Sequence, residues 1–114
     1  MFEQPSDPIL VVRNDRIIDC NIEAATFLGY LHKDSLLNMR PSDISPLMQP
    51  DGIRSDEKVK IVVESAQKNG FHRFEWLHLR ADGSEVLVDI MLTLMKLNGE
   101  EVLQVIWRDL NLRN

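Results

Sequence analysis

Three segments in the last third of the chain alternate between apolar and polar residues, and short turns separate them. They cover residues 71–80, 84–97 and 100–110, with Ala81-Asp82-Gly83 and Asn98-Gly99 between them. Alternation with a period of two is typical of β-strands, and Asp-Gly and Asn-Gly pairs favour hairpin turns because both residues accept positive φ. The pattern predicts three consecutive antiparallel strands.

Two shorter β-branched runs, residues 9–12 and 16–20, flank the turn residues 13–15 and predict a hairpin near the start of the chain. Asn21 follows, and its side chain can cap a helix that begins at Ile22 and stops at Gly29. Cys20, the only cysteine, ends the second run, and we interpret it as a small buried thiol.

The middle of the chain carries three prolines between residues 33 and 52, which predicts only short turns, at 33–37 and 42–44. Ser55 is expected to cap the next helix, of about 13 residues, which Asn69-Gly70 ends. Apolar residues recur on one face of that helix at the spacing i, i+3, i+4, i+7: Val59, Val62, Val63 and Ala66.

The alternation divides the side chains of the last three strands between two faces. One face is apolar and aromatic: Phe74, Trp76, His78, Val86, Val88, Ile90, Leu92, Leu94, Leu103, Val105 and Trp107. The opposite face is mixed but still holds six large apolar residues: Leu77, Leu79, Leu87, Met91, Met95 and Ile106. A face turned to water would not carry so many, so we expect a second protomer, or a flanking helix beyond this sequence, to cover it.

Composition narrows the possible functions. The 114 residues are enough for one domain, and 44% of them are hydrophobic. The net charge is −5 and the arginines are dispersed, which argues against direct binding of nucleic acid. A single cysteine fits a reducing, cytoplasmic environment, and the longest apolar run, Ile9 to Val12, is too short for membrane insertion.

Candidate chemistry is sparse. His72 and His78 lie about 20 Å apart along one strand and cannot share a metal ion, and His32 is not expected to complete a site, so no metal site is predicted. Most carboxylates fall in turns or first helical turns, and Asp89 lies on the face opposite His78, so no catalytic pair forms. An enzyme is therefore not expected. The remaining catalytic alternative is a small cone-shaped α+β isomerase or dehydratase, a class that usually opens with a long helix rather than a hairpin.

Three segments, taken in order, resemble the PAS domain family. Residues 21–30 resemble its Asn-x-x-Ala-x-x-x-x-Gly-Tyr signature, and residues 80–90 resemble its Lys/Arg-x-Asp-Gly-Ser hairpin. Residues 44–55 resemble a Gln-Pro-Asp-Gly loop of a bacterial subgroup. The resemblance covers about residues 8–110, which leaves 1–7 as a leader and 111–114 as the start of a linker to an effector domain.

This resemblance implies an α+β fold in which helices cover one face of a five-stranded antiparallel sheet of order 2-1-5-4-3 and enclose a cavity. It also implies a sensory or signal-relay module of a larger bacterial signalling protein, of the diguanylate cyclase, histidine kinase or chemoreceptor type. Many members end the last strand with Asp-x-Thr; Asp109 matches and is the candidate relay residue, but Asn111 takes the third place. A ligand-free homodimerisation module is the alternative.

The cofactor is unknown, and two versions of the family are disfavoured. Haem sensors use a histidine on or near the long helix, and residues 55–69 contain none. Flavin photosensors use a cysteine before that helix, and residues 21–114 contain none. A small apolar or aromatic ligand remains possible, although a filled core would give the same pattern. The candidate pocket residues are Phe27, Phe74, Trp76, His78, Ile90, Leu92, Val105 and Trp107.

Two further expectations complete the sequence-based picture. His78 is placed near the cavity rim, either as a solvent-facing side chain or as a hydrogen-bonding contact to a ligand. The six apolar residues of the opposite face, together with residues near the N-terminus, are expected to form a homodimer interface.

Overall fold

The computed structural model describes residues 7–110 and contains every predicted element, with boundaries within about two residues of those expected. The elements follow in this order: β1 (Ile9–Arg13), β2 (Arg16–Cys20), α1 (Ile22–Phe27), the 3-10 turns η1 (Lys33–Leu36) and η2 (Pro41–Ile44), α2 (Ser55–Asn69), β3 (Phe71–Leu79), β4 (Glu85–Leu97) and β5 (Glu100–Asp109). The strands form one antiparallel sheet in the order β2-β1-β5-β4-β3, which confirms the expected fold class and strand order.

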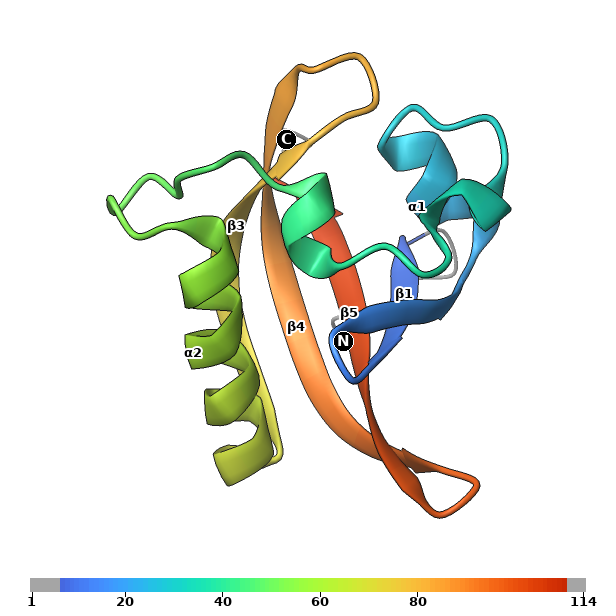
Figure 1. Ribbon diagram of the computed structural model, residues 1–114, viewed down its shortest axis with the longest axis vertical. Helices are drawn as coiled ribbons and strands as arrows, with labels where there is room; N and C mark the ends of the chain where they lie inside the picture. Colours follow the sequence, from blue (N-terminus) through green and yellow to red (C-terminus); the bar gives the residue numbers. More distant parts are fainter. Residues whose placement is uncertain (1–6, 111–114) are drawn as a thin grey trace.

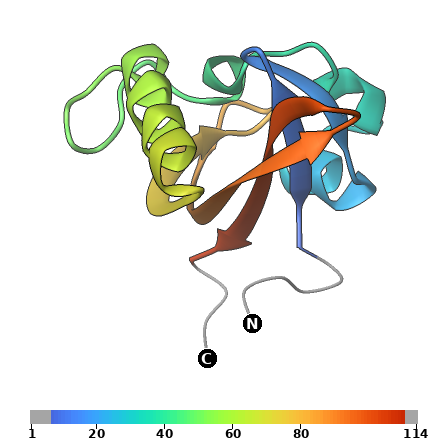
Figure 2. The ribbon, with the colours of Figure 1, turned by 90° about the horizontal axis from the view of Figure 1, so that it is seen from below.

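Long-range pairing of β1 with β5 joins the N-terminal hairpin to the C-terminal strands. Leu10 lies opposite Val105, and Ile9 lies opposite Ile106. The first and last strands are therefore neighbours, and Figure 2 shows both described ends of the chain on the side of the sheet away from α2. The start of β1 therefore lies beside the C-terminal half of β5.

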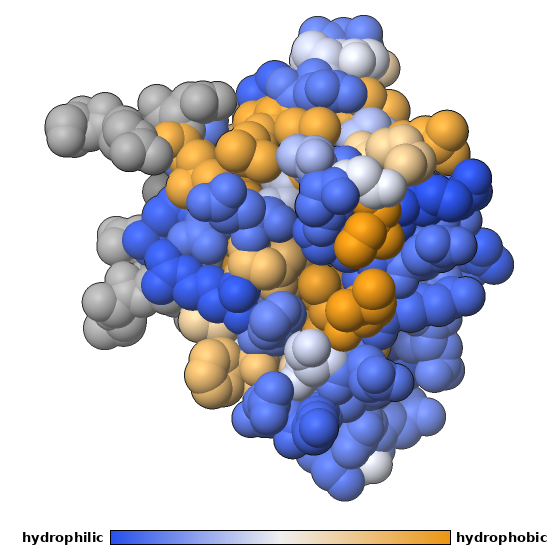
Figure 3. Space-filling model, turned by 90° about the vertical axis from the view of Figure 1, so that its left-hand side faces the viewer, coloured by the Kyte–Doolittle hydropathy of each residue, from blue (hydrophilic) through white to orange (hydrophobic). Residues whose placement is uncertain are grey.

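The helices lie on one face of the sheet, as Figures 1 and 2 show for α2 and η2. The core fills the space between them and the sheet, and Trp107, with 1% of its surface exposed, is its largest fully buried side chain. The side of the molecule formed by α2 and the edge of β3 is largely hydrophilic, with apolar side chains gathered in its middle and upper parts (Figure 3).

Asn21 caps α1 as predicted and also fastens the helix to the sheet. Its Oδ1 accepts hydrogen bonds from the amides of Ala24 and Ile9, both at 3.0 Å. Its Nδ2 donates to the carbonyl of Asp7 at 2.9 Å. One amide side chain thus satisfies three backbone groups that would otherwise need other partners.

Ser55 does not cap α2, contrary to expectation. Arg54 occupies the cap position without a side-chain hydrogen bond, and Ser55 is the first helical residue, 2% exposed. Its hydroxyl accepts from Gln49 Nε2 at 2.9 Å and donates to the carbonyl of Pro46. The side chain points inward because both of its partners, Gln49 and Pro46, belong to the preceding loop. Helix-capping preferences consider only the first residues of the helix and so could not predict these partners.

Gln49 holds the same loop against the outer edge of β3. Its Oε1 accepts from the amide of Leu77 at 2.8 Å, and its Nε2 donates to the carbonyl of Leu77 at 3.1 Å. The Gln49 side chain, 3% exposed, thus pairs with both backbone groups of Leu77, as a neighbouring strand would at this open edge of the sheet.

The two C-terminal turns differ. Asn98 and Gly99 both have positive φ, 52° and 84°, as an Asn-Gly hairpin requires. At the other turn only Gly83 has positive φ, at 89°, so the expectation that Asp82 also has positive φ is wrong. Asp82 instead accepts hydrogen bonds from the amide and hydroxyl of Ser84, at 2.9 and 2.6 Å, which stabilises a longer loop.

Candidate functional site

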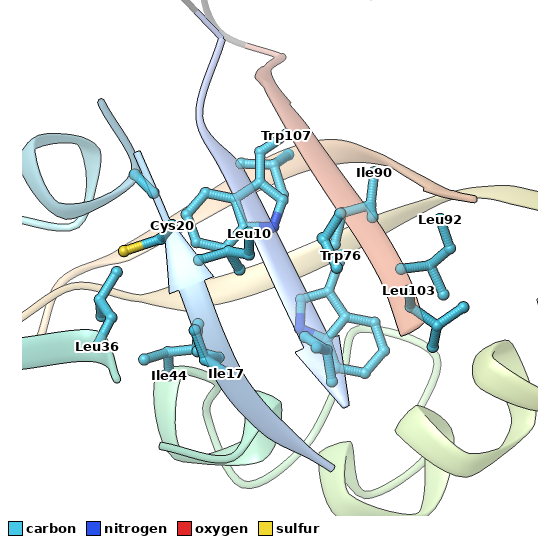
Figure 4. Close-up of a cluster of buried hydrophobic side chains, with 14 of the residues drawn as sticks. Leu10, Ile17, Cys20, Leu36, Ile44, Trp76, Ile90, Leu92, Leu103 and Trp107 are labelled. Atoms are coloured by element: carbon cyan, nitrogen blue, oxygen red, sulfur yellow. The ribbon is translucent and has the colours of Figure 1, made fainter. Parts of the chain in front are cut away.

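An apolar cavity lies between the inner face of the sheet, η2 and α2. Its volume is about 50 Å³. Every strand except β2 contributes to its wall, which consists of Leu10, Val12, Pro41, Ile44, Val59, Val62, Val63, Phe74, Trp76, His78, Ile90, Leu92, Leu103, Val105 and Trp107. Figure 4 shows how side chains from β1, β3, β4 and β5 converge in this part of the core.

Seven of the eight pocket residues predicted from the sequence line this cavity, and Phe27 does not. The ring of Phe27 packs against Trp107 with 5.9 Å between centroids, and the Arg80 guanidinium lies 5.8 Å from the Phe27 centroid. Phe27 therefore supports Trp107 rather than the cavity wall.

Sequence reasoning missed the contributions of β1 and η2 to the cavity. Leu10 and Val12 line it because β1 lies beside β5, a pairing between residues about 95 positions apart. Pro41 and Ile44 reach it from η2, a segment with no periodic pattern. The apolar run at residues 9–12 indicated a strand, but all four residues are apolar, so it did not show which of them face the cavity. Nothing in the sequence marked the second pair.

The size of the cavity restricts what it can hold. An engineered protein cavity of about 150 Å³ binds benzene, and sites for drug-sized ligands measure about 300–1,000 Å³. At about 50 Å³ the space suits a molecule of roughly two to four heavy atoms. Haem and flavin are many times larger than this space.

A larger depression of about 510 Å³ adjoins the cavity between α2 and the β1–β2 hairpin. The two share five wall residues: Val12, Pro41, Val59, Val63 and Leu103. Charged residues of both signs surround the depression: Arg13, Asp15, Arg40, Asp56, Lys60 and Glu101. The cavity thus adjoins a polar surface groove on one side.

His78 is buried in the cavity wall, with 3% of its surface exposed, so its placement near a solvent rim is wrong. Its Nδ1 lies 2.9 Å from the carbonyl of Ile44. Because a carbonyl only accepts, Nδ1 carries the proton. Burial lowers the pKa of His78 from 6.5 to about 4, so the ring is neutral at pH 7 and Nε2 is a hydrogen-bond acceptor.

The two tryptophans point to the same side of the sheet but differ in hydrogen bonding (Figure 4). Trp76 Nε1 donates to the hydroxyl of Ser45 at 2.9 Å. Trp107 Nε1 is buried and has no partner within residues 7–110, and the same holds for His78 Nε2. The His78 and Trp107 rings are in contact, with centroids 4.2 Å apart. One buried donor and one buried acceptor without partners therefore lie in adjacent rings of the wall.

The six residues predicted as a dimer face share the outer face of the sheet but differ in exposure. Leu77 lies opposite Leu87, and Met91 lies opposite Ile106. Four of the six are half-buried and Met95 is 43% exposed, whereas Ile106 is 4% exposed and offers a partner almost no surface. Phe71 was not among the predicted residues, but it is 56% exposed and also lies on this face, opposite Thr93.

A charged row crosses this outer face and divides its apolar surface. Glu75, Asp89 and Arg108 lie opposite one another on β3, β4 and β5. Arg73 pairs with Asp89 at 2.6 Å, and Arg108 lies 3.4 Å from Asp7. The alternation had grouped the apolar residues into one surface; the register separates Leu77, Leu79 and Leu87 from the rest.

Comparison with known proteins identifies the family. The family model described as "PAS domain" matches residues 6–111. The chain belongs to the PAS domain family. None of the curated proteins matches it.

Solved PAS domains resemble this one throughout. The PAS domain of an HTR-like protein from Haloarcula marismortui is 26% identical, with a TM-score of 0.78, over 96% of this chain and 85% of the other. A PAS domain from Colwellia psychrerythraea is also 26% identical, with a TM-score of 0.76, over 95% and 89%. A PAS domain solved with ethanol, from a LuxR-family regulator of Burkholderia thailandensis, is 17% identical, with a TM-score of 0.72, over 96% and 94%.

Asp109 ends β5 two residues after Trp107 and lies opposite Val88 on β4. It borders a depression of about 420 Å³ beside α1, together with Phe27 and Trp107. In this PAS domain one strand therefore connects the cavity wall to the candidate relay residue.

Other candidate chemistry in the PAS domain is limited. The thiol of Cys20 is buried, burial raises its pKa, and it contacts the carbonyl of Lys33 at 3.5 Å, which suits a packing role. Within residues 7–110, no three His, Cys, Asp or Glu side chains come together to hold a metal ion. None of the described helices is long and apolar enough to cross a membrane.

Proposed function

We propose that this PAS domain is the sensor of a larger signalling protein, which binds a small molecule in its core cavity and transmits occupancy through β5. The apolar cavity of about 50 Å³ carries this proposal. Residues 8–110 are the sensor, preceded by a leader at 1–7; residues 1–6 and the linker residues 111–114 lie outside the described part of the chain.

Two features support a relay along β5. Trp107 forms part of the cavity wall, and Asp109 follows on the same face of the strand at its end. A ligand that moves the Trp107 ring therefore acts two residues before Asp109 and four residues before the position where the proposed linker begins. The effector is proposed to be of the histidine kinase, diguanylate cyclase or chemoreceptor type.

The similar structures are compatible with this role and with a small ligand. One comes from a two-component sensor histidine kinase, and another, from a LuxR-family regulator, contains ethanol, which has three heavy atoms. The single buried cysteine supports a cytoplasmic location, because a reducing compartment leaves such a thiol free.

Cavity filling tests the sensor proposal on the 114-residue chain. Xenon is the probe, and backbone amide shifts are measured by NMR. We expect xenon to shift the amides of Val105, Trp107 and Asp109. Val105→Phe should fill the cavity, reproduce part of the shift at Asp109 and abolish the response to xenon, whereas Ile61→Phe, at a position 53% exposed on α2, should respond normally. No xenon response, or a response that never reaches Asp109, would refute the proposal.

A second proposed property is homodimerisation through the outer face, independent of any ligand. The partly exposed cluster of Leu77, Leu79 and Leu87 supports it, because such a contiguous apolar surface favours contact with a partner. The interface would have to accommodate the charged row beside this cluster.

Light scattering after size exclusion tests the dimer at several hundred micromolar. Leu77→Glu should give a monomer, because a carboxylate would be buried at the interface without a partner. The control Ile61→Glu changes an exposed apolar residue on α2 and should leave the dimer intact. A monomeric wild-type chain at this concentration contradicts the proposal.

A further inference from the structure

The cavity wall contains one donor and one acceptor that no group within residues 7–110 satisfies. Trp107 Nε1–H can only donate, and His78 Nε2 can only accept because Nδ1 carries the proton toward Ile44. Both side chains are more than nine-tenths buried, at 1% and 3% exposure. Buried polar atoms are usually paired, so two unpaired atoms in adjacent rings point to a missing polar partner.

The two atoms belong to one local site. The ring centroids of His78 and Trp107 are 4.2 Å apart and the ring planes are inclined by 54°. The rest of the wall is apolar, apart from Trp76, whose nitrogen is occupied by Ser45. The free surface of the wall is therefore apolar, and a ligand reaches the two unpaired nitrogens only when one of these rings turns.

A hydroxyl group complements this pair, because its hydrogen donates and its oxygen accepts. An ether or a ketone accepts but cannot donate, and an amine or a carboxylate would carry charge into an apolar cavity. From this geometry we infer that the cavity binds a small aliphatic alcohol of about one to three carbons, whose O–H donates to His78 Nε2 and whose oxygen accepts from Trp107 Nε1–H. This inference depends on the proposed ligand-sensing function and specifies its ligand class.

Binding also supplies a reason for signalling. Neither nitrogen touches free space in the described arrangement, since each has almost no exposed surface. The alcohol therefore has to turn one of the two rings by a small angle to reach both atoms. The Trp107 ring is attached to β5, so its rotation transmits occupancy toward Asp109.

Ethanol and dimethyl ether, which are isomers of equal size, provide the test. A molecule of three heavy atoms binds with a Kd of about 1 mM at best, so NMR titration up to 100 mM is suitable. We expect ethanol to bind about 3- to 10-fold more tightly than dimethyl ether, the gain from an added hydrogen bond. The indole N–H resonance of Trp107 should shift downfield with ethanol. The Trp76 indole N–H, already bonded to Ser45, is the internal control and should change little.

His78→Leu removes the acceptor with a side chain of similar volume and should reduce the ethanol-to-ether ratio to about one. The comparison of isomers on the wild-type chain remains decisive if this variant does not fold. Equal affinity for both isomers with an unmoved Trp107 N–H overturns the inference while leaving the cavity and the sensor proposal intact.

Two further results would also overturn the inference. One is a direct Trp107–His78 hydrogen bond, detected by coupling between the two nitrogens, that persists with ethanol. The other is a water molecule retained at these nitrogens when ethanol is present. Absence of binding by ethanol, dimethyl ether and xenon together would refute the sensor proposal itself.

Discussion

Acidification should destabilise this domain well above the pH at which its carboxylates protonate, because His78 is buried in neutral form. Its pKa falls from 6.5 to about 4 on folding, and the causes are burial and, in the opposite direction, the hydrogen bond to Ile44. The unfolded chain therefore gains a proton at His78 as the pH drops below 6.5, while the folded chain does not until about pH 4. The stability present at pH 7.5 is thus lost progressively through this window.

The magnitude follows from the size of the shift. A difference of one pKa unit corresponds to about 1.36 kcal/mol. The full effect is therefore about 3 kcal/mol below pH 4, and about 2 kcal/mol is already lost between pH 7.5 and pH 5. For a domain of this length, 2 kcal/mol corresponds to a fall in Tm of roughly 8 °C.

Urea unfolding at half-unit steps between pH 7.5 and 4.5 measures the effect. His78→Phe should remove most of the slope in this range, whatever its absolute stability. The same change at His72, a half-buried residue of the same strand, should preserve the wild-type slope. Three aspartates have a pKa below the usual 3.8 because of side-chain hydrogen bonds: Asp51 with Lys58, Asp56 with Arg54, and Asp82 with Ser84. Their contributions to the free energy of unfolding are lost only as the pH falls below about 3.8, outside the range that is measured. A wild-type stability that is flat from pH 7.5 to 5 would refute the neutral buried His78.

Two further variants test how loops are attached to the sheet. Asn21→Ala should lower the free energy of unfolding by about 2 kcal/mol, because it removes the cap of α1 and the hydrogen bonds to Asp7 and Ile9. Asn21→Asp keeps the acceptor and should lose less stability. Equal losses in the two variants would contradict this account. Gln49→Ala should lower the free energy of unfolding by about 2 kcal/mol and accelerate hydrogen exchange at the Leu77 amide, because both hydrogen bonds to Leu77 are lost. Gln67→Ala, at an exposed position of α2, is the control. Unchanged exchange at Leu77 would show that Gln49 does not hold the edge of β3.

Prediction from the sequence succeeded where the physical cause is local. Alternation, the Asn98-Gly99 turn and the Asn21 cap each depend on residues within a few positions of one another, and all three appear in the structure. It failed for Ser55, whose hydroxyl bonds to Gln49 instead of capping α2. It also failed for Asp82, which does not adopt positive φ and instead accepts a hydrogen bond from Ser84.

The candidate site was only half accessible from the sequence. The inner face of β3, β4 and β5 followed from the pattern, so seven of eight proposed residues line the cavity. The burial of His78 did not follow, because its partner Ile44 belongs to a 3-10 turn 34 residues earlier. The unpaired nitrogens of His78 and Trp107 also appear only once two distant strand positions are in contact.

Local sequence patterns were sufficient to predict the elements, their order and the two faces of the sheet, because periodicity and turn chemistry act over a few residues. Three properties became visible only in the folded chain: β1 closes the cavity, a charged row divides the outer face, and the cavity measures about 50 Å³. These properties depend on register and on packing between segments far apart in the chain. A single-residue change in register would move every side chain of a strand to the other face, so no local pattern can fix them alone.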